Sequence, residues 1–180
     1  MNEVILTKLF NESLNIFLTY ETENILDTVA ERNLCGRLAI YMTPKLEEYG
    51  IKNYFADTEY NRKQAGRVKT MLDNEENIIA IQCDLIIHSR GNFIKHDNLI
   101  AIEMKKSTRP EFEKVADRKR LRTMTKDSYD GVWSWEAEVH PEHVCGYLLG
   151  VYVIINILKR SCLIEYYSHG NLINQRSQNF

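Results

Sequence analysis

Three stretches of the chain are almost continuously apolar and rich in strand-forming residues, and they constrain the fold more than any other feature. They cover residues 78–88, 99–105 and 144–157. Strands without a polar face are typical of sheets covered on both faces. Helical spacing of apolar residues predicts the covering layers over 3–19, 23–48 and 109–126. The expected fold class is α/β, with a central mixed sheet of about five strands flanked by helices on both faces.

The remaining segments complete a single expected domain over residues 1–180. Residues 53–59 and 162–168 predict further strands, and residues 60–78 are polar with a possible short helix. The short polar connection over 89–98 indicates an antiparallel hairpin between the strands on either side of it. Pro44 is expected to kink or shorten the second helix, and the polar tail 170–180 is expected to fray.

Composition excludes several classes of protein. The four cysteines are scattered without a C-x-x-C pair, which disfavours a disulfide framework or a zinc ribbon. The N-terminus does not have the pattern of a signal peptide. The longest apolar run, residues 147–158, is too short to span a bilayer. We therefore expect a cytoplasmic protein with reduced thiols and no membrane association.

An acid and a base stand inside one of the apolar runs. In NLIAIEMKKS, residues 98–107, Glu103 and Lys105 are two positions apart and point to the same face of a strand. Ile102 and Met104 point to the opposite face. A charged pair inside a buried strand needs a chemical reason, because burial disfavours each charge.

A second acid in the preceding run suggests that reason. Asp84 lies within IIAIQCDLII, and a hairpin would place it beside Glu103. Two close carboxylates repel each other and lose hydration, and a divalent cation removes both penalties. Mg²⁺ favours a few carboxylate oxygens together with waters and phosphate. Lys105 would then orient or deprotonate an attacking water, or stabilise charge on the phosphate.

The spacing D-x(18)-E-x-K, from Asp84 through Glu103 to Lys105, resembles the PD-(D/E)XK nuclease superfamily, which has the restriction-endonuclease-like fold. The sequence around these residues is similar to an uncharacterised bacterial branch of that superfamily. The order of elements over residues 23–168 is similar too, with Glu31 as the acid of the first helix. Cys83 departs from the pattern, since a proline usually precedes the aspartate.

The resemblance implies a role for each matching residue. Asp84, Glu103 and the backbone carbonyl of Met104 would bind Mg²⁺, with Mn²⁺ able to substitute. Lys105 would serve the attacking water, and Glu31 would bind the metal or an outer water. The implied activity is hydrolysis of DNA, or alternatively RNA, in defence or repair, by a homodimer or a larger assembly.

Basic residues gather directly after the proposed site. A phosphate backbone would suit such a cluster, although acids are interspersed and a solvated helix of mixed charge is the alternative. Net charge is −2, so only the local distribution favours an anionic partner. The candidate nucleic-acid contacts are Lys106, Arg109, Arg118, Lys119 and Arg122.

Three other motifs carry weaker signals. Glu59 follows a predicted strand and would lie near the metal, whereas the adjacent Tyr60, Asn61 and Arg62 fit a turn. A zinc site in the segment HPEHVC is disfavoured, because its proline prevents a regular helix and a fourth ligand is missing. The two tryptophans of VWSW would stack on a base or pack a loop onto the core.

Two alternatives to a nuclease stay open. In the first alternative, the chain is a catalytically silent module of the same fold that binds nucleic acid or a protein. In the second, it is an unrelated α/β domain. In the second case Glu103 and Lys105 form an ion pair near a strand end, and backbone groups satisfy Asp84.

Overall fold

The structure is a computed structural model. It describes residues 2–59, 70–72, 78–80, 83–93, 96–127 and 146–180. Its helices are α1 (Glu3–Tyr20), α2 (Thr22–Leu26), α3 (Glu31–Glu48) and α4 (Glu111–Met124). Its strands are β1 (Phe55–Thr58), β2 (Thr70–Leu72), β3 (Ile78–Ala80), β4 (Leu85–His88), β5 (Asn98–Lys106), β6 (Leu149–Asn156), β7 (Ser161–Ser168) and β8 (Asn171–Asn179).

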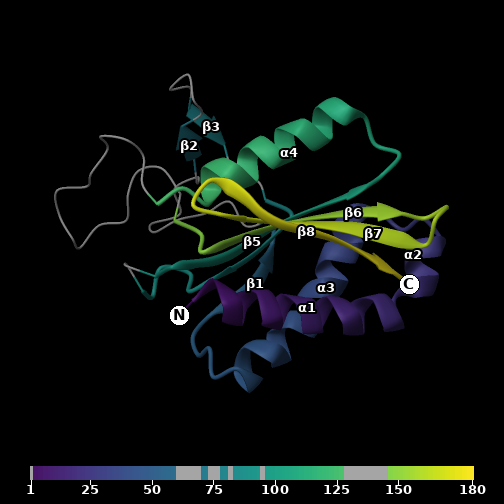
Figure 1. Cartoon of the computed structure of the whole chain (residues 1–180). Coiled ribbons are helices and arrows are strands. Elements are labelled where there is room, and N and C mark those ends of the chain that lie inside the picture. The colour runs from purple at the N-terminus through teal and green to yellow at the C-terminus, as the bar shows by residue number, and fades with distance from the viewer. Residues whose placement is uncertain (1, 60–69, 73–77, 81–82, 94–95, 128–145) are drawn as a thin grey trace.

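The main sheet has six strands in the order β1-β4-β5-β6-β7-β8 (Figure 1). Strands β5 and β6 run parallel, and every other neighbouring pair is antiparallel. The parallel pair is connected through α4, as a parallel connection requires a crossover. The predicted α/β class and mixed sheet are confirmed, with six strands where about five were expected.

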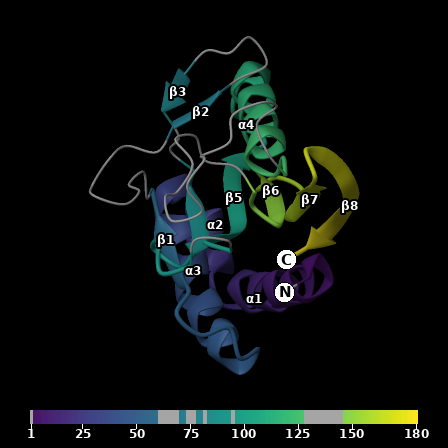
Figure 2. The ribbon, with the colours of Figure 1, turned by 90° about the vertical axis from the view of Figure 1, so that its left-hand side faces the viewer.

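Helices cover both faces of this sheet (Figures 1 and 2). Helices α1 and α3 lie against one face and share an apolar cluster with Ile100, Ile102 and Met104 of β5. Helix α4 lies over the other face, where Ala101 belongs to a smaller cluster. Side chains alternate along β5, so Glu103 is directed to the α4 face, buried beneath that helix.

The prediction of a single helix over residues 23–48 is wrong. Helix α2 ends at Leu26, and Thr28 takes a positive φ of 58°, which a right-handed helix cannot accommodate. Ala30 is extended and caps α3, so Glu31 opens a new helix. Pro44 does not shorten this helix, which continues to Glu48.

The apolar run 78–88 is not one strand. Ile78–Ala80 pairs with Thr70–Leu72 in a separate two-stranded sheet, whereas Leu85–His88 belongs to the main sheet. A short helix was possible over 60–78, but the described residues of that segment are strand: Thr70–Leu72 form β2, and Ile78 begins β3. The other residues of the segment lie outside the described part. Apolar composition predicted strand correctly but could not reveal a change of sheet within the run.

The predicted fraying of residues 170–180 is also wrong. Strand β8 pairs with β7 over its whole length. His169 and Gly170 have φ values of 48° and 74° and form the two-residue turn between them. The tail is polar because β8 is an edge strand whose side chains are mostly exposed.

Candidate metal and catalytic site

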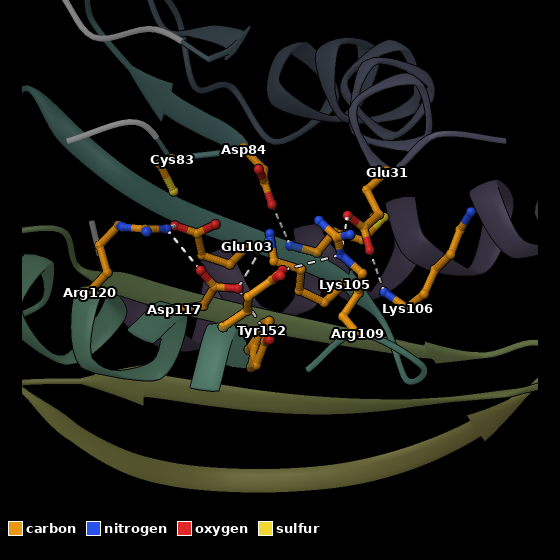
Figure 3. Close-up of polar contacts among 12 residues, drawn as sticks. Glu31, Cys83, Asp84, Glu103, Lys105, Lys106, Arg109, Asp117, Arg120 and Tyr152 are labelled. Atoms are coloured by element: carbon orange, nitrogen blue, oxygen red, sulfur yellow. Dashed lines mark hydrogen bonds and ion pairs between the residues drawn. The ribbon is translucent and has the colours of Figure 1, made fainter. Parts of the chain in front are cut away.

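The hairpin of β4 and β5 brings Asp84 beside Glu103 (Figure 3). Leu85 pairs with Ile102, and the next position in this register sets Asp84 opposite Glu103. Oδ2 of Asp84 accepts a hydrogen bond from the backbone N–H of Met104 at 2.9 Å. The two predicted metal ligands therefore lie side by side, Asp84 directly before β4 and Glu103 within β5.

Cys83, directly before Asp84, helps to hold this hairpin. The thiol of Cys83 donates a hydrogen bond to the carbonyl of Ile102 at 3.1 Å. Its pKa is raised well above the ordinary value, chiefly by burial and then by the charges of Glu103 and Asp84. Cys83 is thus a protonated, structural thiol at the edge of the acidic pair.

Burial makes both carboxylates costly to ionise. The pKa of Glu103 is raised well above its ordinary value by complete burial and, secondly, by the negative charge of Asp84. Burial also raises the pKa of Asp84, although the N–H of Met104 and the charge of Lys105 oppose that rise. Two coupled acids with raised pKa values are a frequent mark of functional sites.

Helix α4 adds two charged residues that the motif does not include. Nη1 of Arg120 donates to Oε1 of Glu103 and lies 3.1 Å from Oδ1 of Asp117. The second oxygen of Glu103, Oε2, is buried and has no hydrogen-bond partner among the described residues. An unsatisfied oxygen on a buried carboxylate costs free energy, and it is free to bind a ligand.

Lys105 contacts Asp117 of α4, and this pair lies close to the acids of the hairpin. Its Nζ lies 3.6 Å from Oδ2 of Asp117, which also accepts a hydrogen bond from the hydroxyl of Tyr152 at 3.3 Å. Burial lowers the pKa of Lys105, but the charges of Asp117 and Asp84, and then those of Glu31 and Glu103, raise it above the ordinary value overall. Lys105 is therefore a protonated ammonium in this site.

Glu31 lies at the margin of the cluster, and its oxygens are already bonded. Oε1 accepts the backbone N–H of Lys106 at 2.8 Å, and Oε2 lies 3.6 Å from Nε of Arg109. These contacts fasten the start of α3 to the end of β5. The buried thiol of Cys35, one turn along α3, has a pKa raised by burial and then by Asp84 and Glu103, so α3 does approach the acids.

The oxygen atoms of Asp84 and Glu103 are the donors that this site offers to a metal ion. Within the described part of the chain, no group of three or more His, Cys, Asp or Glu side chains is arranged to hold a metal ion. Mg²⁺ in proteins commonly uses one or two carboxylates and completes its shell with waters and phosphate. Asp84 together with the unsatisfied Oε2 of Glu103 fits that requirement.

The predicted basic cluster does not form one open surface. Arg118 binds Glu165 through Nε and Nη2 and also pairs with Glu111, and Nζ of Lys106 donates to the carbonyl of Thr28. Arg109 pairs with Glu31 and Glu113. Arg122 contacts the Gly170 carbonyl and the Tyr167 ring. Lys119 is exposed on α4. These contacts give no support to DNA binding, which stays a prediction.

Glu59 lies close to the site through its backbone. Its N–H donates to the carbonyl of Asp84 at 3.2 Å, whereas its side chain pairs with Arg32 at 2.8 Å. The remaining weaker candidates, which are Tyr60, Asn61, Arg62, Trp133, Trp135, His140, His143 and Cys145, lie outside the described residues.

Asp117 and Arg120 were missed by the sequence analysis, although a signal was present. Asp117, Leu121 and Met124 follow helical spacing, and all three are buried on one side of α4. An acid within an apolar stripe, with an arginine one turn later, indicates a buried charged contact. The mixed charge of the helix obscured that pattern.

A groove of about 500 Å³ lies elsewhere, between α1 and β8. It is lined in part by Asn11, Asn15, Tyr166 and Asn174. Its polar groups are partly satisfied by one another, as the hydroxyl of Tyr166 donates to Oδ1 of Asn11 at 2.6 Å. The acidic pair under α4 is the stronger candidate site, because it contains the buried unsatisfied oxygen.

Comparison with models of known protein families finds no match to this chain. Comparisons with curated proteins and with solved structures find none either. None of the described helices is long and apolar enough to cross a membrane.

Proposed function

We propose that this protein is a divalent-metal-dependent nuclease that hydrolyses phosphodiester bonds of DNA. One observation carries the proposal: half-buried Asp84 and fully buried Glu103 lie together, both carboxylates have raised pKa values, and Oε2 of Glu103 has no hydrogen-bond partner among the described residues. A cation at this point would offset their repulsion and satisfy that oxygen. Lys105 supplies a fixed positive charge on the same face.

The order of elements supports the proposal. An acid on α3 is followed by the antiparallel strands β1, β4 and β5, then by α4, and then by β6 parallel to β5. This is the order that the resemblance to PD-(D/E)XK nucleases implies for residues 23–168. Strands β2 and β3 are an addition to it, and Cys83 replaces the usual proline.

Asp84, Glu103 and the carbonyl of Met104 would hold Mg²⁺ or Mn²⁺. When bound, the ion stabilises negative charge on the phosphate and makes a coordinated water more acidic. Glu31 acts from the margin, where its bond to the N–H of Lys106 fixes the end of β5. The hairpin and α3 thus hold the ligands in place before substrate arrives, which is what preorganisation requires.

Of the roles predicted for Lys105, the structure favours charge stabilisation and water orientation. A general base must lose its proton near neutral pH, but surrounding acids raise the pKa of Lys105. Asp117 holds the ammonium in place, and Tyr152 holds Asp117. Lys105 would therefore bind a phosphate oxygen or the attacking water as a donor.

A second candidate is a catalytically silent module of the same fold. It is favoured by the contact between Arg120 and Glu103, because a guanidinium neutralises a buried carboxylate without any metal. Such a module would bind nucleic acid or a protein and show no turnover.

Incubation of the purified protein with supercoiled plasmid, single-stranded DNA and RNA tests the proposal and separates the two candidates. We expect cleavage of DNA with Mg²⁺ or Mn²⁺ and none with EDTA. D84N, E103Q and K105M should each slow cleavage on the order of 100-fold or more. The first two each remove a ligand of the ion that stabilises transition-state charge, and K105M removes a positive charge that does so directly. E111Q, which alters an exposed acid on α4, is the matched control.

Cleavage that persists in all three variants would contradict the assignment of the site. Absence of cleavage from the wild type, with nucleic acid still bound, would favour the silent module.

A further inference from the structure

Arg120 and the hairpin acids form one partly buried electrostatic cluster, defined here as Asp84, Glu103, Lys105, Asp117 and Arg120 (Figure 3). The side chains of Glu103 and Asp117 are 1% and 4% exposed, so water screens them little. Arg120 reaches both from α4 through the same nitrogen. It is the cation in contact with Glu103 among the described residues.

We propose that Arg120 is a resident counter-cation that sets the metal affinity of the Asp84–Glu103 pair. This inference rests on the proposed metal site and concerns its regulation. Arg120 holds Oε1 of Glu103 and leaves Oε2 for the ion. Arg120 therefore neutralises the buried carboxylate of Glu103 when no ion is bound. The same positive charge lowers the affinity of the site for the ion.

The charges of the cluster explain this effect. Its three carboxylates face two cations, so the ionised cluster carries one net negative charge. Without the guanidinium it would carry two, and a divalent cation nearby would be attracted more strongly. The same removal would leave Glu103 and Asp117 with less compensation, which destabilises a buried acid strongly.

Metal binding and folding should therefore change in opposite directions when Arg120 is replaced. R120Q removes the charge but keeps an amide that can donate to Glu103, and R120K keeps the charge. R122Q removes an arginine of the same helix that contacts the Gly170 carbonyl and the Tyr167 ring instead. It is the matched control for loss of charge from α4.

The test is a titration of each protein with Mn²⁺. Binding is monitored by the melting temperature of the protein and by the electron paramagnetic resonance signal of the free ion. In EDTA, we expect R120Q to have a lower melting temperature than the wild type. Added Mn²⁺ should raise the melting temperature of R120Q more than that of the wild type. R120Q should reach half-saturation at a Mn²⁺ concentration about tenfold lower than the wild type. R120K and R122Q should half-saturate within about threefold of the wild type.

The outcomes separate this inference from the proposed function. If the wild type binds Mn²⁺ and R120Q binds it equally or more weakly, the role of Arg120 is overturned while the metal site stands. An R120Q protein that stays unfolded in saturating Mn²⁺ also overturns it, because the ion should replace the missing charge. If neither protein binds Mn²⁺, the metal site and the role of Arg120 both fail.

Discussion

The ammonium of Lys105 lies 3.6 Å from the Oδ2 atom of Asp117, a buried carboxylate on α4. The contact joins the end of β5 to the helix that covers it. Asp117 also contacts Arg120 and accepts a hydrogen bond from Tyr152, so one carboxylate positions two cations. Helix α4 thereby becomes part of the site as well as a cover for the sheet.

Replacing Asp117 by asparagine should lower the free energy of unfolding by about 2–4 kcal/mol, because it leaves two partly buried cations without their shared partner. The pKa of Lys105 should fall as well, since Asp117 is the acid that raises it most. Urea unfolding measures the first effect, and ¹³C NMR of the lysine ε-carbons measures the second. Loss of stability no greater than that of E111Q, an exposed acid on the same helix, would show that Asp117 is not a positioning residue.

Glu103 should give the wild type a distinctive dependence of stability on pH. Its pKa is higher in the folded protein than its ordinary value of 4.5, so the folded state binds the proton more tightly. Its contribution to stability is full below that ordinary value and falls as pH rises toward the raised pKa. E103Q cannot titrate at this position, so its free energy of unfolding should improve relative to the wild type as pH rises.

Urea unfolding in EDTA from about pH 5 to about pH 9 would measure that difference. A constant difference between wild type and E103Q over the whole range would mean that Glu103 ionises normally in the folded protein. The buried acid would then give no reason to expect a cation.

The turn before β8 should be sensitive to a small substitution. Gly170 has a φ of 74°, and an added Cβ would lie 3.2 Å from Cγ of Lys126, so G170A should cost about 1–2 kcal/mol. G36A makes the same chemical change in α3, where nothing lies within 4 Å of the added atom. It should stabilise the protein by about 0.5–1 kcal/mol, because alanine favours the helix.

Thermal and urea unfolding of the two glycine variants provides the comparison. Equal effects of G170A and G36A would contradict the turn, and with it the pairing of β8 along β7.

The pairing of Asp84 with Glu103 could be predicted from the sequence, because charged side chains are unexpected inside apolar strands. Asp84 and Glu103 are conspicuous inside apolar runs, and the short connection between those runs implies an antiparallel pair. The alternation along β5, with Ile102 and Met104 on the face opposite Glu103, followed from the two-residue period of a strand. Local sequence patterns of this kind are enough to predict which side chains lie on the same face of a strand.

Other features depend on contacts that local patterns do not encode. The sequence of β8 has the composition of a loose polar tail, but its backbone pairs with β7, and Arg176 donates hydrogen bonds to Tyr166 and Asn11. The end of α2 at Leu26 interrupts an apolar spacing that continues across it. Asp117 and Arg120 belong to the site only because the crossover places α4 above β5, which their own segment does not reveal.

The central claim is that Asp84 and Glu103 share one divalent cation, and a direct count of bound Mn²⁺ tests it best. Electron paramagnetic resonance of free Mn²⁺, titrated with the full chain, should show one ion bound per wild-type chain. Binding should be lost in the D84N and E103Q variants and retained in E111Q. No binding by the wild type, or equal binding by the D84N/E103Q double variant, would contradict the claim.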